Sequence, residues 1–268
     1  MPEKQQISPL VTLTTDLGTS DHYVAVLKAV MLGINPAIRF VDISHQIPPQ
    51  DIMACAWVVK NAAFYFPEGT IHLVSVDPTT GTNRKPLAVK IKNQLFVGPD
   101  NGAFSLIADQ EEAEIYELSK EDFLGELRSN TFQARDIFAP IAAHLASGVA
   151  LDWIGKKIDS MMNYRWAIPT DDHDSLNGWV VHIDRFGNLI TNISKSLVSS
   201  ASSGRTSKVY AGNTIITGIT STFANVPETE ALAYFNSSDM LEIAINKGNA
   251  QQMLGVEKGS SVTVLFKD

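Results

Sequence analysis

The chain has 268 residues, of which 44% are hydrophobic, so it is long and apolar enough to bury a sizeable core. This composition excludes a largely disordered chain. The formal net charge of −8 argues against a surface that neutralises phosphates, because such surfaces depend on clustered Lys and Arg. We therefore expect no nucleic-acid partner.

The first ten residues are polar, and no stretch of about 18 apolar residues is present to cross a bilayer. We expect a cytoplasmic protein without a membrane partner. The single cysteine, Cys55, has no second cysteine with which to form an internal disulfide, and it lies in an apolar run at 53–59. It is expected to be a small buried residue.

Short β-branched runs alternate with segments of helical spacing over the first 165 residues, which is typical of α/β architecture. The predicted elements, in chain order, are strand 10–14, helix 21–32, strand 38–43, helix 52–65, strand 70–76, the hairpin 87–91 with 94–97, and helix 137–147. Residues 1–165 are thus predicted to form an α/β domain whose central, mostly parallel sheet is flanked by helices.

The stretch 168–174 is polar, contains a proline and lacks periodicity, which predicts a linker over residues 166–176. Short strands separated by turn residues follow at 179–183, 189–193, 208–211, 213–217, 231–235, 241–245 and 261–266. This pattern predicts a smaller all-β, barrel-like domain over 177–268, with a Ser-rich loop at 199–207.

Two carboxylates follow the first predicted strand, at the strand end where open α/β sheets bind ligands. Asp16 suits the paired hydroxyls of a ribose, and Asp21 suits a cation at the start of the helix. The structural alternative is an Asx-turn at Asp16 and a helix cap at Asp21. The spacing alone does not decide between them.

Asp77 and Arg84 lie seven positions apart in a loop after another strand. The pair could orient a water molecule or act as a structural clamp.

Residues 131–136 precede a helix whose N-terminal amides could face a ligand. In the second domain, Asp184, Phe186 and Asn188 combine an acid, an aromatic ring and an amide, which suit a purine, although β-turn chemistry also explains the Gly-Asn pair at 187–188.

Several common motifs are absent: a glycine-rich dinucleotide loop after the first strand, a P-loop, and Cys or His at metal-binding spacing. The six histidines are scattered, so no metal site and no cofactor are expected.

Polar loops at 236–238 and 246–250 flank a strand and could present backbone groups to a base and a carboxylate.

Seven motifs in order make the chain resemble the S-adenosyl-L-methionine hydroxide adenosyltransferases, relatives of the fluorinase and chlorinase enzymes. They are TDLGTSDHYVAVLKAVM at 15–31, HQIPPQDI at 45–52, FPEGTIHLVSVDPTTGTNRKP at 66–86, GPDNG at 98–102, TFQARDIFAP at 131–140, IDRFGNLITNI at 183–193 and FNSSDMLEIAINKGNA at 235–250. The resemblance runs nearly end to end.

The resemblance implies a homotrimer whose substrate sites lie at subunit interfaces, with S-adenosyl-L-methionine as substrate and no cofactor. It implies that Asp16 holds the ribose hydroxyls, that Asp21 and Asp184 face the methionine ammonium, and that Ser237 meets the carboxylate. The remaining substrate contacts that it implies are Phe132, Phe186, Asn188, Phe223, Ile245 and Lys247.

Asp77 and Arg84 match two members of the family's water-activating Asp–Arg–His triad, whereas Gln133 stands where the histidine is expected. Glutamine positions water but does not accept a proton near neutral pH. The resemblance therefore implies hydrolysis of S-adenosyl-L-methionine to adenosine and L-methionine by water attack at C5′. The alternatives are a catalytically impaired binding protein, because of Gln133, and a chlorinase-like enzyme, because Ala134 leaves room for a larger ion.

Overall fold

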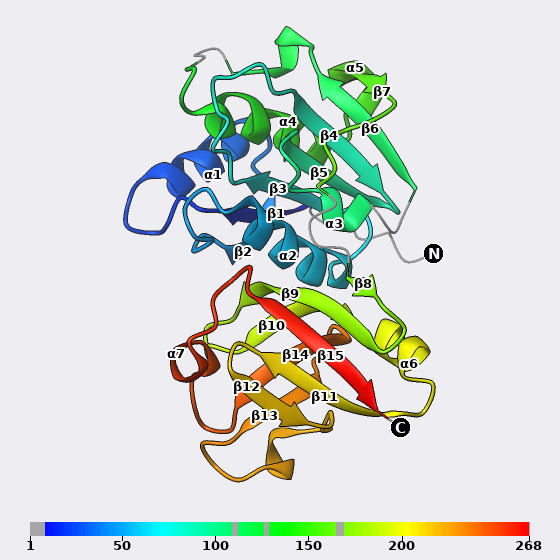
Figure 1. Ribbon diagram of the computed structural model, residues 1–268. Coiled ribbons are helices and arrows are strands. Elements are labelled where there is room, and N and C mark those ends of the chain that lie inside the picture. Colours follow the sequence, from blue (N-terminus) through cyan, green and yellow to red (C-terminus); the bar gives the residue numbers. More distant parts are fainter. Residues whose placement is uncertain (1–8, 109–111, 126–128, 165–168, 268) are drawn as a thin grey trace, which may run out of the picture. The chain divides into compact units, whose positions relative to one another are not determined.

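The computed structural model describes residues 9–108, 112–125, 129–164 and 169–267. The chain divides into two compact units, Met1–Tyr164 and Arg165–Asp268. The first unit is an α/β structure and the second is all-β apart from short helices, as the ribbon in Figure 1 shows. Each unit has hydrophobic core clusters of its own.

The first unit follows the predicted order of strands and helices, with additional short elements. Its elements are β1 (Leu10–Thr15), α1 (Tyr23–Ile34), β2 (Arg39–Ser44), α2 (Ile52–Ala62), the 3₁₀ turn η1 (Ala63–Tyr65), β3 (Ile71–Ser75), β4 (Pro86–Ile91), β5 (Gln94–Pro99), α3 (Ser105–Ala108), β6 (Ala113–Leu118), η2 (Glu121–Phe123), the π-turn η3 (Ala134–Phe138), α4 (Ala139–Ala146), α5 (Leu151–Ile154) and β7 (Gly155–Ile158).

The sheet of the first unit is mixed, so the prediction of a mostly parallel sheet is wrong. Its strand order is β2-β1-β3-β5-β4-β6-β7. The pairs β1–β2, β1–β3 and β3–β5 are parallel, whereas β4–β5, β4–β6 and β6–β7 are antiparallel. The reason is the tight turn at Lys92 and Asn93, since a two-residue connection joins only antiparallel strands. Strands β6 and β7, which extend the sheet beyond β4, also pair in the antiparallel orientation.

Helices cover both faces of this sheet because side chains along each strand alternate between two cores. Leu73 of β3 packs in one core cluster with Leu27 of α1 and Ile141 of α4. The next residue, Val74, packs in the other cluster, together with Cys55 of α2 and Phe104. The prediction that Cys55 is buried is confirmed.

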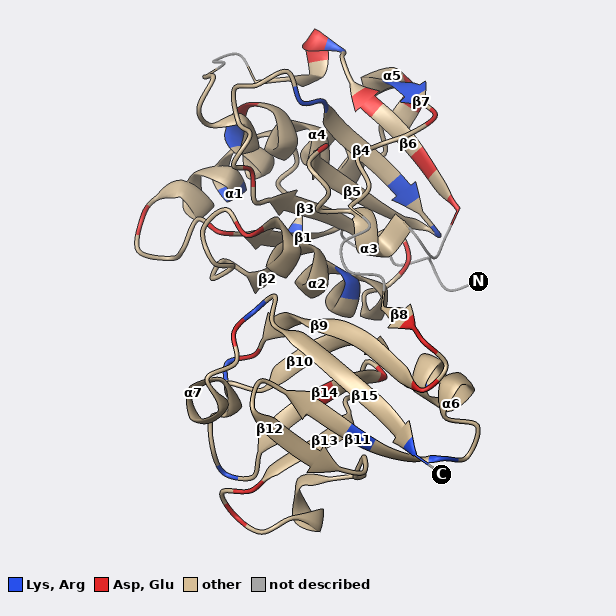
Figure 2. Ribbon diagram, in the orientation of Figure 1, with Lys and Arg blue, Asp and Glu red and all other residues tan. Residues whose placement is uncertain are grey.

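Strands β6 and β7 were not predicted, and charged residues explain why. On β6, the Glu114 carboxylate forms ion pairs with two lysines: its Oε1 lies 2.7 Å from Lys90 Nζ on β4, and its Oε2 lies 3.4 Å from Lys157 Nζ on β7. Figure 2 shows these acidic and basic segments alternating across that edge of the sheet. These charged side chains hide the apolar alternation of both strands from sequence analysis, and charges on the edge strand β7 discourage pairing with other chains.

The second unit is a nearly closed, barrel-like β-structure, as predicted. Its strands are β8 (Thr170–Asp171), β9 (Ser175–Ile183), β10 (Leu189–Ser194), β11 (Thr206–Ala211), β12 (Thr214–Thr217), β13 (Ala231–Phe235), β14 (Met240–Ile245) and β15 (Ser261–Lys267), and its helical elements are α6 (Lys195–Ser202), η4 (Phe223–Asn225) and α7 (Ala250–Leu254). The strand order is β12-β11-β15-β9-β10-β14-β13, with β8 paired to β9. The two ends of this order approach each other where the Thr220 amide donates to the Ala233 carbonyl at 2.8 Å.

Two segments are more regular than the sequence predicts. The proposed linker 166–176 contains β8 and the start of β9, while its residues 166–168 lie outside the described residues. The predicted Ser-rich loop at 199–207 includes the end of α6 and the start of β11. Ser194 explains the helix, because its hydroxyl accepts a hydrogen bond from the Leu197 amide as an N-cap.

Candidate functional site

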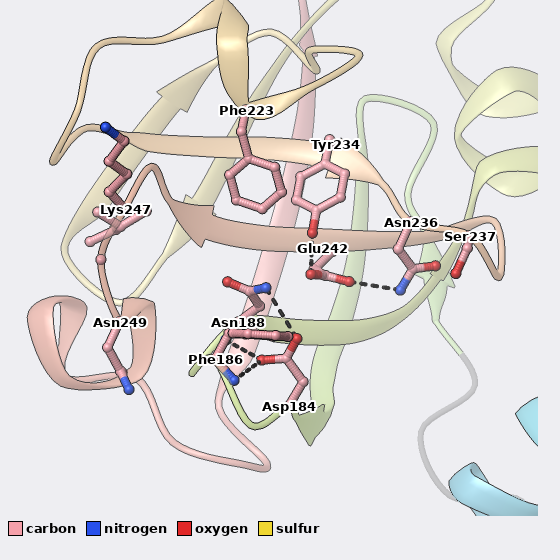
Figure 3. Close-up of a pocket in the computed structure, with 12 residues that line it drawn as sticks. Asp184, Phe186, Asn188, Phe223, Tyr234, Asn236, Ser237, Glu242, Lys247 and Asn249 are labelled. Carbon is pink, nitrogen blue, oxygen red and sulfur yellow. Dashed lines mark hydrogen bonds between the residues drawn. The ribbon is translucent and has the colours of Figure 1, made fainter.

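A pocket of about 760 Å³ opens in the second unit, within the usual size range of ligand sites. Seven residues singled out from the sequence line it: Asp184, Phe186, Asn188, Phe223, Ser237, Ile245 and Lys247. Asn236, Gly248 and Asn249, from the polar loops 236–238 and 246–250, also line it, as do two residues that the sequence did not single out, Tyr234 and Glu242. Figure 3 shows their side chains gathered around β13, β14 and the turn that carries Phe186.

Asp184 organises one wall of this pocket through the turn between β9 and β10. Its Oδ1 accepts hydrogen bonds from the Phe186 and Asn188 amides, both at 2.9 Å. Its Oδ2 accepts from the Asn188 side-chain amide at 3.1 Å. The turn chemistry considered from the sequence is therefore present, and it also holds three of the predicted residues at the pocket.

Gly187 allows this turn to lie against α7. Its φ is +83°, and a Cβ at this position would come within 2.2 Å of the Asn249 side chain. The Gly187 carbonyl accepts a hydrogen bond from the Gln251 amide at 2.9 Å, while Asn249 caps α7. Phe186 is thereby held at the rim with 74% of its surface exposed, an unusual position for a phenyl ring that suits stacking on a planar ligand.

A buried carboxylate, Glu242 on β14, joins two other walls of the pocket. It accepts hydrogen bonds from the Tyr234 hydroxyl and, at 2.9 Å, from the Asn236 side-chain amide. The Tyr234 ring in turn contacts the Phe223 ring, with 5.0 Å between centroids. Burial and the neighbouring Glu242 carboxylate raise the pKa of Tyr234 well above its usual value, so this hydroxyl stays protonated.

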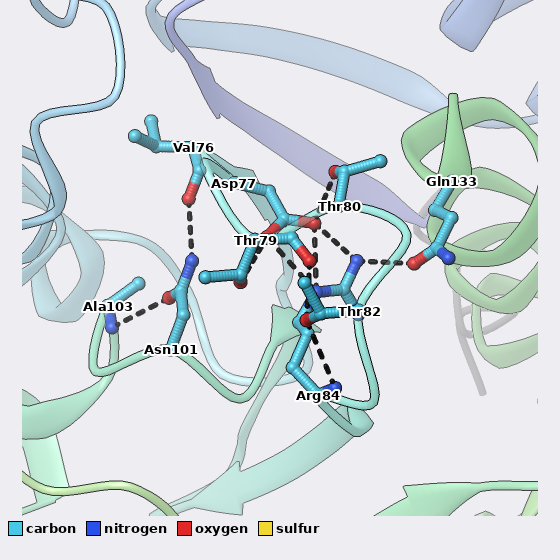
Figure 4. A network of polar contacts seen from close by, with 9 residues as sticks. All are labelled: Val76, Asp77, Thr79, Thr80, Thr82, Arg84, Asn101, Ala103 and Gln133. Atoms are coloured by element: carbon cyan, nitrogen blue, oxygen red, sulfur yellow. Dashed lines mark hydrogen bonds and ion pairs between the residues drawn. The ribbon is translucent and has the colours of Figure 1, made fainter. Parts of the chain in front are cut away.

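The predicted catalytic residues of the first unit come together in one polar network, drawn in Figure 4. The Nε atom of Arg84 donates to both Asp77 carboxylate oxygens, at 3.0 and 2.9 Å, and its Nη2 donates to Asp77 and to Gln133 Oε1. The hydroxyls of Thr79 and Thr80 donate to Asp77 at 2.9 and 2.7 Å.

This network fixes the guanidinium rather than leaving Asp77 free as a base. Each Asp77 oxygen already accepts hydrogen bonds from a threonine hydroxyl and from Arg84. The Arg84 and Asp77 side chains are each only 6% exposed, and the guanidinium lies 5.3 Å from the centroid of the Phe138 ring. The structural clamp considered from the sequence is therefore present.

The clamp leaves one donor of Arg84 unused. Within the described part of the chain, Arg84 Nη1 is buried and has no hydrogen-bond partner. A buried donor without a partner is costly, and such a group commonly marks a site for water or a ligand. Arg84 also lines a second pocket, of about 490 Å³, together with Thr79, Thr82 and Asn101. The geometry therefore offers a fixed cationic donor for an oxygen atom.

Asp16, Asp21 and Phe132 lie elsewhere in the first unit. Asp16 follows β1, and its Oδ2 accepts a hydrogen bond from the Gln50 amide at 2.8 Å. Asp21 is exposed and does not cap α1, since His22 is the N-cap residue and forms no side-chain capping bond. Phe132 makes an edge contact with Tyr23, with 5.3 Å between centroids.

The backbone amides before the predicted helix 137–147 are not available in the way the sequence suggested. The helical region begins earlier, as the π-turn η3, and the Arg135 and Asp136 amides donate back to the Phe132 carbonyl at 3.1 and 3.2 Å. Asp136 is buried and accepts from the Ser129 amide and from Arg135. This segment therefore positions Gln133 and does not form an anion cradle from these two amides.

Among the described residues, no group of three or more His, Cys, Asp or Glu side chains is placed to hold a metal ion. Nor does any helix in that part of the chain have the length and apolar character that a membrane crossing requires.

The fold and these features define a small-molecule-binding protein with an aromatic and acidic pocket in one unit and a buried cationic donor in the other. Comparison with known proteins is more specific. The chain belongs to the S-adenosyl-L-methionine hydroxide adenosyltransferase family: the family's N-terminal domain matches residues 11–155 and its C-terminal domain matches residues 178–263.

Individual relatives span nearly the full chain. A Thermus thermophilus protein named (R)-S-adenosyl-L-methionine hydrolase is 35% identical, covering 95% of this chain and 99% of its own length. A protein of Actinoplanes sp. named fluorinase is 27% identical, covering 96% of this chain and 97% of its own. A crystal structure of an uncharacterised conserved protein from Thermotoga maritima superposes with a TM-score of 0.88 at 35% identity, covering 96% of this chain and 99% of that one.

Proposed function

We propose that this protein hydrolyses S-adenosyl-L-methionine to adenosine and L-methionine. The observation that carries this function is the buried Arg84 guanidinium, which Asp77 and Gln133 fix and whose Nη1 nitrogen has no hydrogen-bond partner among the described residues. Support also comes from the Thermus thermophilus relative, whose name gives this activity and whose sequence is 35% identical. No cofactor enters the reaction, since S-adenosyl-L-methionine is itself the substrate.

In the proposed step, the oxygen of one water molecule forms a bond to C5′ of the substrate while the bond from C5′ to sulfur breaks. The electron pair of that bond stays on sulfur, so the sulfonium becomes the neutral thioether of methionine. The water loses one proton to solvent, and the remaining O–H becomes the 5′ hydroxyl of adenosine. Because a sulfonium is a good leaving group, alignment of the water supplies much of the acceleration.

Arg84 Nη1 donates to the attacking water and stabilises the hydroxide character that develops on its oxygen. Asp77 holds the guanidinium in place through both carboxylate oxygens, and Gln133 accepts from Nη2, the nitrogen that also donates to Asp77. Gln133 therefore acts by positioning, since an amide does not take up a proton near neutral pH. This arrangement supports hydrolysis without the histidine of the family's triad.

The pocket of the second unit is proposed to bind the substrate. Phe186 and Phe223 supply aromatic contacts to adenine, Asn188 and the backbone at Ile245 and Lys247 read its edge, and Asp184 and Ser237 meet the amino-acid end. From the first unit, Asp16 is proposed to bind the ribose hydroxyls, Asp21 the ammonium, and Phe132 the substrate. We expect a homotrimer in which neighbouring subunits complete each site.

The test is incubation of the purified protein with S-adenosyl-L-methionine in chloride-free buffer, with adenosine and methionine followed by liquid chromatography. We expect equal amounts of the two products. Binding without turnover would instead identify an impaired binding protein, and 5′-chloro-5′-deoxyadenosine on addition of chloride would identify a halide-using enzyme. Absence of adenosine in the chloride-free incubation, with either of these results, would contradict the proposed function.

A further inference from the structure

We propose that Glu242 determines specificity by recognising the ammonium group of the amino-acid part of the ligand. This inference rests on the proposed function, because it concerns the same pocket. Glu242 is only 4% exposed, yet it lines the pocket of the second unit. A carboxylate in such a position is costly to bury, and the cost is offset when a cation binds beside it.

No basic side chain in the described part of the chain neutralises the charge of Glu242. Its two hydrogen-bond donors, the Tyr234 hydroxyl and the Asn236 amide, are both neutral. The same holds for Asp184, whose donors are backbone amides and the Asn188 side chain. Among the described residues, no Lys, Arg or His forms an ion pair with either acid.

The basic residue of the pocket does not compensate these acids. Lys247 pairs with Glu228, and both side chains are well exposed, at 68% and 65%. In Figure 3 the Lys247 amine points away from the region between Asp184 and Glu242. One end of the pocket therefore combines two acidic side chains with a polar lining, which favours a positively charged group by direct attraction.

The hydrogen bonds around Glu242 hold its carboxylate in one orientation. Asn236 Oδ1 accepts from the Ser238 and Met240 amides, at 2.9 and 3.1 Å, so its Nδ2 must face Glu242. With Tyr234 fixed on the other oxygen, the carboxylate has little rotational freedom. Each carboxylate oxygen has two acceptor sites, so lone pairs remain for a ligand.

Of the two cationic groups in the proposed substrate, the ammonium fits these lone pairs. It carries three N–H donors, whereas a sulfonium has none, and charge-assisted hydrogen bonds are the stronger kind. Asn236 also precedes Ser237, the residue proposed to meet the carboxylate of the same amino-acid group. Ammonium and carboxylate recognition would thus lie on adjoining parts of β13, β14 and their connecting turn.

The test measures binding by isothermal titration calorimetry with ligands that do not turn over. The ligands are S-adenosylhomocysteine, which has the ammonium and a neutral sulfur, its deamino analogue 5′-S-(3-carboxypropyl)-5′-thioadenosine, and adenosine. The proteins are the wild type, Glu242→Gln, and Asp239→Asn as a matched control, since Asp239 is 75% exposed on the same turn and does not line the pocket.

For the wild type we expect the deamino analogue to bind at least about 30-fold more weakly than S-adenosylhomocysteine, the typical effect of removing one partner of a buried charge pair. Glu242→Gln should reduce this ratio to a few-fold and leave adenosine affinity unchanged, while Asp239→Asn should behave as wild type. The analogue comparison in the wild type needs no variant, so it stands even if Glu242→Gln does not fold.

Equal affinity of the wild type for the two thioether ligands would overturn the inference. So would a Glu242→Gln variant that weakens all three ligands alike, since this would indicate a purely structural role. A raised KM for S-adenosyl-L-methionine with unchanged S-adenosylhomocysteine binding would assign Glu242 to the sulfonium and also overturn it. Adenosine release from S-adenosyl-L-methionine by the wild type tests the proposed function separately.

Discussion

Replacing Arg84 by lysine separates the charge of this residue from its geometry. Lysine retains the positive charge beside the buried Asp77, so the loss of about 3–5 kcal/mol expected for an unpaired buried charge is avoided. It does not retain the planar fork that donates to Asp77 and Gln133 and leaves Nη1 for water. Loss of one or two of these hydrogen bonds should lower the free energy of unfolding by about 1–2 kcal/mol.

The catalytic effect of Arg84→Lys should be larger than this loss of stability. Removal of one fixed donor to a developing negative charge typically lowers kcat by about 10²–10³-fold. We expect that loss in initial rates of adenosine formation, with KM changed by less than about threefold because Arg84 contacts the water. Urea unfolding of the variant checks that the fold is retained.

The matched control is Arg205→Lys in the second unit. Arg205 pairs with Asp174 at 2.8 Å and lines neither pocket, so its replacement should leave kcat unchanged. If Arg84→Lys kept kcat within about threefold of the wild type, the assignment of the water to Arg84 Nη1 would be wrong.

Three further predictions concern single residues. Gln133→His should raise kcat by at least about tenfold at neutral pH, because it adds a proton acceptor, and an unchanged kcat in a stopped adenosine assay would show that proton transfer does not limit the reaction. Burial lowers the pKa of His72 from 6.5 to about 4, so between these pH values the unfolded chain binds a proton that the folded protein does not. The free energy of unfolding should therefore fall by up to about 3 kcal/mol as the pH drops from 6.5 to 4. Urea titrations of His72→Asn should show a weaker pH dependence. Cys55 is buried and burial raises the pKa of its thiol, so it should react with an aromatic disulfide reagent only after unfolding; rapid reaction under native conditions would contradict its buried position.

The elements of the first unit with clear periodicity could be predicted from the sequence. Helix α1 and strand β3 have buried residues at the spacings that amphipathic helices and buried strands require. The sense of the strands beyond β5 could not be read from periodicity alone, because parallel and antiparallel strands share the same alternation. The two-residue turn at Lys92 and Asn93 was the available signal, and it correctly predicted the local hairpin.

Sequence spacing predicted only part of the site, because some of its residues come from distant parts of the chain. Asp77 and Arg84 are seven residues apart and could be paired from the sequence, but Gln133 lies 49 residues beyond Arg84 and entered through family resemblance. Glu242 was missed because it lies within the otherwise apolar strand β14, where the pattern directs attention to packing. A single acid in such a strand is itself a signal, since a buried carboxylate requires partners.

The origin of the oxygen in the product tests the central claim most directly. The protein is incubated with S-adenosyl-L-methionine in water enriched in oxygen-18, and both products are analysed by mass spectrometry. Attack of water on C5′ predicts adenosine labelled once, at the 5′ hydroxyl, and unlabelled methionine. Unlabelled adenosine, or label in the methionine fragment, would show that the water held by Arg84 is not the nucleophile at C5′.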